Sequence, residues 1–155
     1  MMVELNEVSL TYQSPDGEVE ALRRVSFGVK EGEFVSLVGP SGCGKSTLFS
    51  IIAGLEPPSA GQVFVDGELV TAPSAKVGYM PQKDQLFPWR TIWGNVTLGL
   101  ELRGRKNPQE RERVRELLER YGLAEFAQKT PSQLSGGMRQ RCALIRTLAT
   151  APKLL

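Results

Sequence analysis

Apolar and polar residues alternate in two segments near the N-terminus of the chain. In residues 8–12 and again in residues 25–29, apolar side chains occupy every second position, which predicts two half-buried strands. Ser14–Gly17 lies between them and has the composition of a tight turn. Residues 34–38 are mostly apolar, and such a run predicts a strand that is buried on both faces.

The pattern changes after residue 47. Leu48, Ile51, Ile52 and Leu55 have helical spacing, and Gly54 lies near the end of the helix they predict. Further on, two short apolar segments flank an Asp-Gly pair, so residues 62–70 predict a hairpin. Residues 77–80 predict one more short strand. The first half of the chain is therefore expected to be rich in strands.

The second half has the apolar spacing of helices. Thr91, Asn107 and Ser135 can each cap a helix N-terminus with a side-chain oxygen, Pro108 suits a first turn, and Gly122 suits a C-terminal cap. Helices are therefore expected over residues 91–102, 108–121 and 136–149. The buried stripe of the middle helix is expected to be Val114, Leu117, Leu118 and Tyr121.

A glycine-rich segment separates the apolar run at 34–38 from the first helix. Residues 39–47 read Gly-Pro-Ser-Gly-Cys-Gly-Lys-Ser-Thr and match the pattern G-x-x-x-x-G-K-[ST] of a phosphate loop. Glycines let backbone N–H groups approach phosphate oxygens, Lys45 would reach the β- and γ-phosphates, and Ser46 would ligate Mg²⁺. The helix that follows directs its positive N-terminal end at the anion. Cys43 is expected to contribute only its backbone.

The expected nucleotide-binding residues of the phosphate loop are Gly39, Pro40, Ser41, Gly42, Cys43, Gly44, Lys45, Ser46 and Thr47. The alternative is a glycine-rich turn that carries Lys and Ser by chance. At the usual glycine frequency, such a match somewhere in the chain has a probability of about one in a hundred or less. The loop alone does not identify the class of NTPase, but GTPases need a later N-K-x-D for guanine, and the sequence contains none.

A second motif, Leu134–Arg141, reads Leu-Ser-Gly-Gly-Met-Arg-Gln-Arg. A serine hydroxyl and two glycine N–H groups at a helix N-terminus can form an anion site, and the alternative is a plain serine-capped helix. The motif resembles the L-S-G-G-Q signature of the ABC ATPases, with Met138 where Gln is commonest. This resemblance implies that Ser135, Gly136 and Gly137 face the γ-phosphate of ATP held by a second ATP-binding subunit, in a head-to-tail dimer.

The resemblance also assigns two isolated residues. Gln82 matches the glutamine of the family's Q-loop, which implies a place in the catalytic site where it contacts Mg²⁺ and senses the transmembrane partner. The expected metal ligands are therefore Ser46 and Gln82. Tyr12 matches the aromatic residue that stacks on adenine. Without the resemblance, Gln82 would be an ordinary loop residue and Tyr12 a core tyrosine of an edge strand.

The fold class follows from the same resemblance, which runs from Tyr12 to the end of the last helix. It implies an α/β phosphate-loop NTPase lobe of the ABC type, with an antiparallel β subdomain and a helical subdomain. We expect one incomplete nucleotide-binding domain over residues 1–155. In it, residues 1–84 form the β and phosphate-loop core, residues 85–149 form the helical subdomain with the signature, and residues 150–155 begin a truncated strand.

In the family, the strand expected to begin near Leu154 ends in Asp-Glu, and a switch histidine follows. The chain ends before these residues and contains no histidine. The C-terminal part of the core sheet is then missing. Phosphoryl transfer depends on positioning and on neutralised charge, so we expect these residues to bind ATP poorly and to hydrolyse it hardly at all. Open sheet edges and uncovered apolar surface are also expected.

Residues 86–96 resemble the segment that follows the Q-loop in importers of nitrate, sulfonates, taurine and related solutes. The resemblance implies a cytoplasmic ATPase, peripheral on the inner face of the cell membrane. Its partners would be permease subunits and, indirectly, a solute-binding protein. Phe87 and Trp89 would suit docking of the permease's cytoplasmic helix, and the alternative is that both are core residues of the helical subdomain.

Composition is compatible with this interpretation. The net charge is +2, which is smaller than the basic bias expected of a nucleic-acid-binding protein. The sequence has two cysteines and no histidine, which argues against a zinc site and against a disulfide framework. The N-terminus does not have the pattern of a secretory signal. Two other interpretations stay open: a soluble ABC ATPase of DNA repair or translation, and a non-catalytic ATP-binding module.

Overall fold

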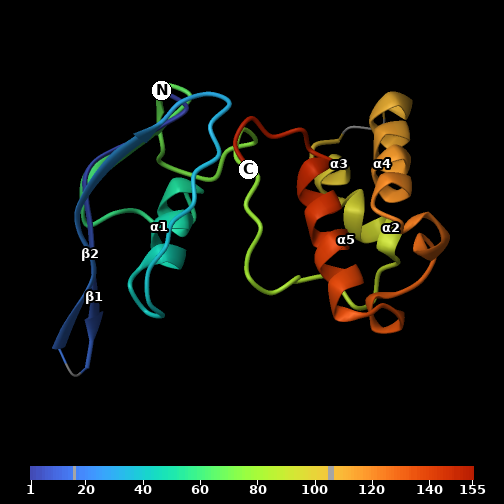
Figure 1. The fold of residues 1–155 in the computed structure, drawn as a ribbon, viewed down its shortest axis with the longest axis horizontal. Helices are drawn as coiled ribbons and strands as arrows, with labels where there is room; N and C mark the ends of the chain where they lie inside the picture. The colour runs from blue at the N-terminus through green and yellow to red at the C-terminus, as the bar shows by residue number, and fades with distance from the viewer. Residues whose placement is uncertain (16, 105–106) are drawn as a thin grey trace. The chain divides into compact units, whose positions relative to one another are not determined.

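Two long antiparallel strands run through the first part of the chain (Figure 1). The computed structural model describes residues 1–15, 17–104 and 107–155. Strand β1 (Val3–Ser14) pairs along one edge with β2 (Gly17–Val29) and along the other with β3 (Ala60–Val65). The short strand β4 (Glu68–Leu69) follows β3, so the order across the antiparallel sheet is β2-β1-β3-β4.

The sequence predicted these strands, although they are longer than the alternation indicated. β1 and β2 pair at Ser14 and Gly17, while Asp16 of the expected turn lies outside the described residues. The hairpin at residues 62–70 is confirmed. Its turn residues Asp66 and Gly67 have φ angles of 52° and 75°, as a tight two-residue hairpin turn requires.

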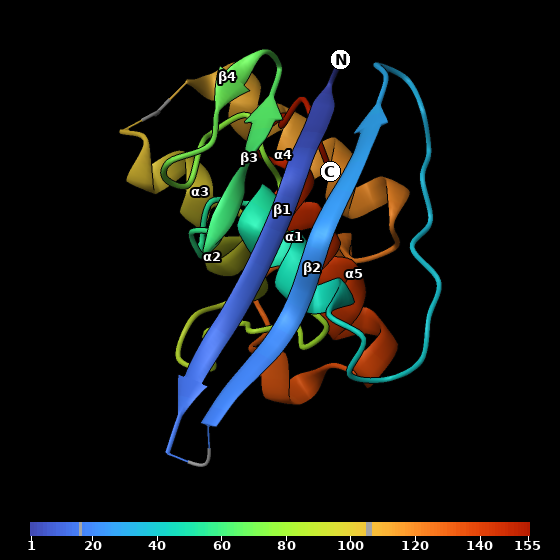
Figure 2. The same ribbon diagram turned by 90° about the vertical axis from the view of Figure 1, so that its left-hand side faces the viewer.

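Helix α1 (Lys45–Ile52) lies against one face of this sheet, where it contacts β2 and β3 (Figure 2). Leu48, Ile51 and Ile52 are buried, as their spacing predicted. Leu55 was expected on the same face, but it is 56% exposed. Gly54, with a φ of 72°, ends the helix before Leu55 is reached.

Two predicted strands are wrong. Residues 34–38 form no strand, and Phe34 and Val38 are 98% and 93% exposed. In residues 77–80 the only pairing is an isolated parallel bridge between Val77 and Leu154. A strand buried on both faces needs neighbouring strands for its backbone hydrogen bonds, and no described residue pairs with the segment 34–38.

Helices make up most of residues 75–155. They are α2 (Ile92–Val96), α3 (Leu98–Leu102), α4 (Pro108–Arg120) and α5 (Gly136–Leu148), with 3₁₀ turns at Ala124–Phe126 and Pro131–Gln133. All three predicted caps are confirmed, because the side chains of Thr91, Asn107 and Ser135 accept hydrogen bonds from backbone N–H groups of the first turns. Gly122 has a φ of 68° just after α4, as a C-terminal cap requires.

The single helix expected over residues 91–102 is divided at Thr97. This residue is both the C-cap of α2 and the N-cap of α3. Its buried hydroxyl lies 2.9 Å from the carbonyl oxygen of Trp93 and 3.0 Å from the Glu101 carboxylate, and its single hydrogen is shared between these two acceptors. A threonine that bonds back to the preceding turn tends to bend or interrupt a helix, and the apolar pattern gave no sign of this break.

The four helices enclose one apolar core. Val114 and Leu118 are buried in it, and Leu117 and Tyr121 pack against it, so the predicted stripe of α4 is confirmed. The most deeply buried members from the other elements are Ile92, Val96, Leu100, Leu123, Cys142, Ala143 and Ile145.

The described residues divide into two compact units, Met1–Ser74 and Ala75–Leu155. The first holds the sheet, the phosphate loop and α1, and the second holds the helical core. The functional division at residue 84, which the motifs suggested, stays a prediction. Within residues 1–15, 17–104 and 107–155, no helix has the length and apolar character needed to cross a membrane.

Candidate nucleotide site

The phosphate loop, residues 39–47, leads directly into the N-terminus of α1. Gly42 and Gly44 have φ angles of 81° and 87°, a region that glycine enters without steric cost. At Gly44 a Cβ atom would also lie 2.5 Å from the carbonyl oxygen of Ala21 on β2. Glycine is therefore required at position 44 both by the backbone angle and by the close approach of the strand.

The loop folds back on itself around Lys45. The Lys45 Nζ atom donates to the carbonyl oxygens of Gly39 at 2.8 Å and Pro40 at 2.7 Å, and it lies 3.2 Å from the Cys43 sulfur. A Cβ atom on Gly39 would lie 2.8 Å from that sulfur, so a side chain at position 39 would require the Cys43 side chain to move. The ammonium group is thus held inside a ring of neutral loop atoms.

This arrangement fits a bound polyphosphate. The ammonium is held by neutral carbonyl groups, and a phosphate oxygen is a stronger partner for it because both members of the pair are charged. Backbone N–H groups in the first turn of a helix have no intrahelical partner, so α1 offers donors beside Lys45. Ser41 and Ser46 are exposed, and their hydroxyls are accessible from solvent.

The donor set also fits a magnesium ion held mainly by its nucleotide. Mg²⁺ commonly binds one or two protein oxygens and completes its shell with phosphate oxygens and water. Ser46 supplies a hydroxyl at the start of α1. The described part of the chain has no group of three or more His, Cys, Asp or Glu side chains that could hold a metal alone.

Tyr12 lies in the same unit, on β1. Its hydroxyl donates to the Glu56 carboxylate at 2.9 Å. Burial and this carboxylate raise the pKa of the Tyr12 hydroxyl, while a hydrogen bond with Thr47 opposes the rise. Because Thr47 belongs to the phosphate loop, Tyr12 stands beside the loop with its side chain 39% exposed. The expected adenine-stacking residue is therefore close to the expected phosphate-binding residues.

The other predicted residues lie in the second unit. Gln82 is exposed, and its backbone carbonyl accepts a hydrogen bond from Gln140 at 3.1 Å. Ser135 caps α5 and accepts from the N–H of Met138 at 3.3 Å. Gly136 and Gly137 are exposed, and nothing lies within 4 Å of a Cβ built on Gly137. The start of α5 is thus open to an approaching anion, although its role in binding one stays a prediction.

A buried asparagine that the sequence did not single out as functional shapes the surface near Trp89. Asn95 is 0% exposed. Its Oδ1 accepts from the N–H of Phe87 at 2.7 Å, and its Nδ2 donates to the carbonyls of Phe87, Arg90 and Thr91 at 3.0–3.3 Å. This fixes the turn in which the rings of Phe87 and Trp89 lie 5.1 Å apart. Trp89 is 76% exposed, so it is not a core residue, while Phe87 is half-buried.

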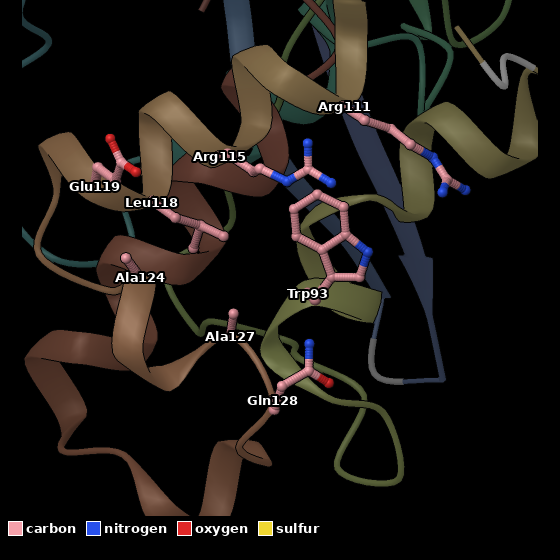
Figure 3. Close-up of a pocket in the computed structure, with 8 residues that line it drawn as sticks. All are labelled: Trp93, Arg111, Arg115, Leu118, Glu119, Ala124, Ala127 and Gln128. Atoms are coloured by element: carbon pink, nitrogen blue, oxygen red, sulfur yellow. The ribbon is translucent and has the colours of Figure 1, made fainter. Parts of the chain in front are cut away.

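A cavity of about 400 Å³ opens between α2, α4 and the first 3₁₀ turn of the second unit (Figure 3). The guanidinium of Arg115 stands over the Trp93 ring at 5.5 Å from its centroid, and Arg111, Leu118 and Glu119 complete the wall on α4. None of the predicted site residues lines this cavity, so it does not belong to the candidate nucleotide site.

The comparison with known families decides the class of NTPase. A family model described as ABC transporter matches residues 22–155. The chain belongs to this family. The phosphate loop and the signature are both inside the matched range, as the resemblance of the motifs implied.

Curated relatives of this ABC transporter chain include ATP-binding subunits of import systems. It is 46% identical over 155 residues to the taurine import ATP-binding protein of Rhizobium johnstonii, covering 99% of this chain and 59% of the relative. It is 41% identical over 155 residues to the aliphatic sulfonates import ATP-binding protein of Bacillus cereus, covering 100% of this chain and 61% of the relative. The chain thus spans about three-fifths of the length of these relatives.

Solved structures agree with the family. A dimeric ATP-binding cassette with ADP and Pi bound is 38% identical to this ABC transporter chain and superposes on it with a TM-score of 0.87, covering 97% of this chain and 71% of that one. The predicted fold class is therefore confirmed: the chain has the α/β fold of part of an ABC ATPase, with an antiparallel sheet and a set of helices.

Proposed function

We propose that the chain is part of the ATP-binding subunit of an ABC importer, with the phosphate loop as the site that holds the triphosphate of ATP. The observation that carries the proposal is the position of Lys45 inside a ring of loop atoms, directly before the N-terminus of α1. A cation and a helix N-terminus at one point form a site for several negative charges. The family and the neighbour structure with ADP and Pi support ATP as the ligand.

The candidate site residues of the first unit have distinct roles in this proposal. The N–H groups of residues 41–47 and the Lys45 ammonium bind the phosphates, and Ser46 ligates Mg²⁺ through its hydroxyl. Bound Mg²⁺ neutralises charge on the phosphate oxygens. Tyr12 stacks on the adenine ring, where an aromatic side chain contributes about 1–3 kcal/mol per base.

In the second unit, the signature contributes to a nucleotide bound by another subunit, and Gln82 contributes to the metal that Ser46 binds. We place Ser135, Gly136 and Gly137 against the γ-phosphate of ATP in a head-to-tail dimer, and Gln82 beside the metal. The dimeric state of the neighbour structure supports this arrangement. Hydrolysis requires a base or water-positioning residue and a metal-binding acidic residue, and we assign it to a protein with the full length of the relatives.

The exposed Trp89 and its neighbour Phe87 supply a contact for a permease. Trp89 is exposed and lies in a turn that the buried Asn95 holds through backbone hydrogen bonds, and it has the aromatic character that is enriched at protein interfaces. We place this contact at the cytoplasmic face of the cell membrane, with a solute-binding protein on the other side. The relatives support a small anionic or zwitterionic cargo such as a sulfonate, taurine or nitrate.

Transport in reconstituted vesicles tests this proposal. The full-length subunit is assembled with its permease in proteoliposomes that contain ATP, the solute-binding protein is added outside, and uptake of labelled taurine, an alkanesulfonate and nitrate is measured. We expect uptake of one of these solutes, and no uptake when Lys45→Ala replaces the parent. ATP hydrolysis without uptake of any of the three would refute the assignment of cargo. Failure to hydrolyse ATP at all would refute the function itself.

A further inference from the structure

Three side chains of α5 hold the loop 82–85 through hydrogen bonds. Gln140 donates to the carbonyl of Gln82 at 3.1 Å, and the Arg139 Nε atom lies 3.1 Å from the Asp84 carboxylate. Arg146 donates from its two terminal nitrogens to the carbonyls of Gln85 and Asp84, both at 2.8 Å. The loop is thus bonded along its length to a single helix.

Arg146 bridges two successive carbonyl groups of the loop, a contact that depends on the shape of the guanidinium group. A planar guanidinium presents its N–H groups in a fixed fork, whereas an ammonium offers donors around a single point. Burial lowers the pKa of the Arg146 guanidinium, as expected for a partly desolvated cation. Gln85 has a φ of 46°, and a non-glycine residue keeps such an angle only where its surroundings fix it.

The same helix begins at the signature. Arg139 donates to the carbonyl of Leu134 at 2.8 Å while it pairs with Asp84, so one side chain contacts both the loop 82–85 and the residue before Ser135. At the ends of the loop, Leu86 is buried and Met80 packs against the helical core. Apolar packing thus anchors the ends of the loop, and the arginines determine where its middle lies.

We infer that Arg139 and Arg146 are positioning residues that join the loop 82–85 to α5 as one body, so that a displacement of Gln82 moves the signature with it. This inference rests on the proposed function, in which Gln82 contacts the metal and Ser135 contacts the nucleotide of a partner subunit. In that setting the two arginines set the distance between two parts of the catalytic site without touching ATP themselves.

Spin labelling of the 155-residue chain tests whether the arginines hold the loop 82–85 on α5. A nitroxide is attached to Lys83→Cys in a Cys43→Ser background, where Cys142 stays unlabelled because it is buried and burial raises the pKa of its thiol to about 12. We expect Arg146→Met to make the label markedly more mobile and Arg146→Lys to restore its immobilisation only in part. Arg141→Met is the matched control on the same helix, because Arg141 bonds the carbonyl of Tyr121 instead, and it should leave the spectrum unchanged. A parent-like spectrum in Arg146→Met would overturn the inference.

Kinetics of the full-length subunit test whether this positioning matters for ATP hydrolysis. We expect Arg146→Met to lower kcat for ATP by about tenfold or more, because misplaced catalytic groups slow a reaction steeply, while the affinity for ATP stays within about twofold because the phosphate loop is untouched. Arg139→Gln is a second variant in case Arg146→Met does not fold. A parent-like kcat in a folded variant overturns the inference alone. If the parent does not hydrolyse ATP, the proposed function fails, and the spin-label comparison still decides the inference.

Discussion

At the scale of single residues, Gly44 shows how a motif position is fixed by geometry. Its φ of 87° disfavours any residue other than glycine, and a Cβ atom there would lie 2.5 Å from the carbonyl oxygen of Ala21. We expect Gly44→Ala to abolish ATP binding and to lower the free energy of unfolding by more than its control does. Gly32→Ala is the control, because Gly32 has a φ of 79° and nothing lies within 4 Å of the position that a Cβ atom would take. Only backbone strain of about 1 kcal/mol is therefore expected in this variant. Urea unfolding and equilibrium dialysis measure both effects, and equal losses in the two variants would contradict the account.

Tyr12 gives a second prediction at this scale. If its ring stacks on adenine, Tyr12→Ala should weaken ATP binding by about 5- to 100-fold, from a stacking contribution of about 1–3 kcal/mol. Binding of inorganic tripolyphosphate should be unchanged, because that ligand has no base. Tyr12→Phe keeps the ring and loses only the hydrogen bonds of the hydroxyl to Glu56 and Thr47, so it should retain ATP binding. Equal weakening for both ligands in Tyr12→Ala would show that the residue supports the loop and not the base.

At the scale of elements, local chemistry could be predicted from the sequence, and long-range pairing could not. Thr91, Asn107 and Ser135 were predicted as caps and are caps, because a cap depends on a few adjacent residues. Residues 34–38 were predicted as a buried strand, but they form no strand and Phe34 and Val38 are exposed, because a strand needs partners that its own pattern does not specify.

The candidate site follows the same division. The phosphate loop and the signature were visible because their chemistry lies in consecutive residues. The bonds from Arg139 and Arg146 to the loop 82–85 span more than 50 positions, and nothing local marks them except the seven-residue spacing that puts both arginines on one face of α5. The break at Thr97 was missed for a related reason, since a threonine hydroxyl can bond solvent or the preceding turn equally well.

The helical core provides the prediction at this scale. Leu118 is 2% exposed and belongs to the core of the second unit, so Leu118→Ala should lower the free energy of unfolding by about 2–5 kcal/mol. Leu102→Ala is the matched control at the end of α3, where the side chain is 79% exposed, and its effect should stay within about 0.5 kcal/mol. Urea unfolding followed by circular dichroism gives both values, and a small effect in Leu118→Ala would contradict the assignment of the core.

At the scale of the whole molecule, large apolar side chains are exposed in a segment that belongs to no helix or strand. Phe34 and Val38 are 98% and 93% exposed in one segment, and exposed apolar clusters promote association. We expect the 155-residue chain to self-associate and the double variant Phe34→Ser, Val38→Ser to do so less, as measured by sedimentation velocity. Leu102→Ser is the control for an isolated exposed side chain. If the double variant associates as strongly as the parent, another surface is responsible.

The central claim is that the phosphate loop binds ATP through Lys45, and calorimetric titration of the 155-residue chain with Mg-ATP tests it most directly. We predict weak, saturable binding by the parent, and a loss of about 10- to 100-fold in Lys45→Ala, because a charge-assisted hydrogen bond contributes about 1.5–3 kcal/mol. Lys30→Ala, which removes an equal charge outside the loop in the same unit, should bind like the parent. Equal affinity of the parent and Lys45→Ala, or no binding by the folded parent, would contradict the account.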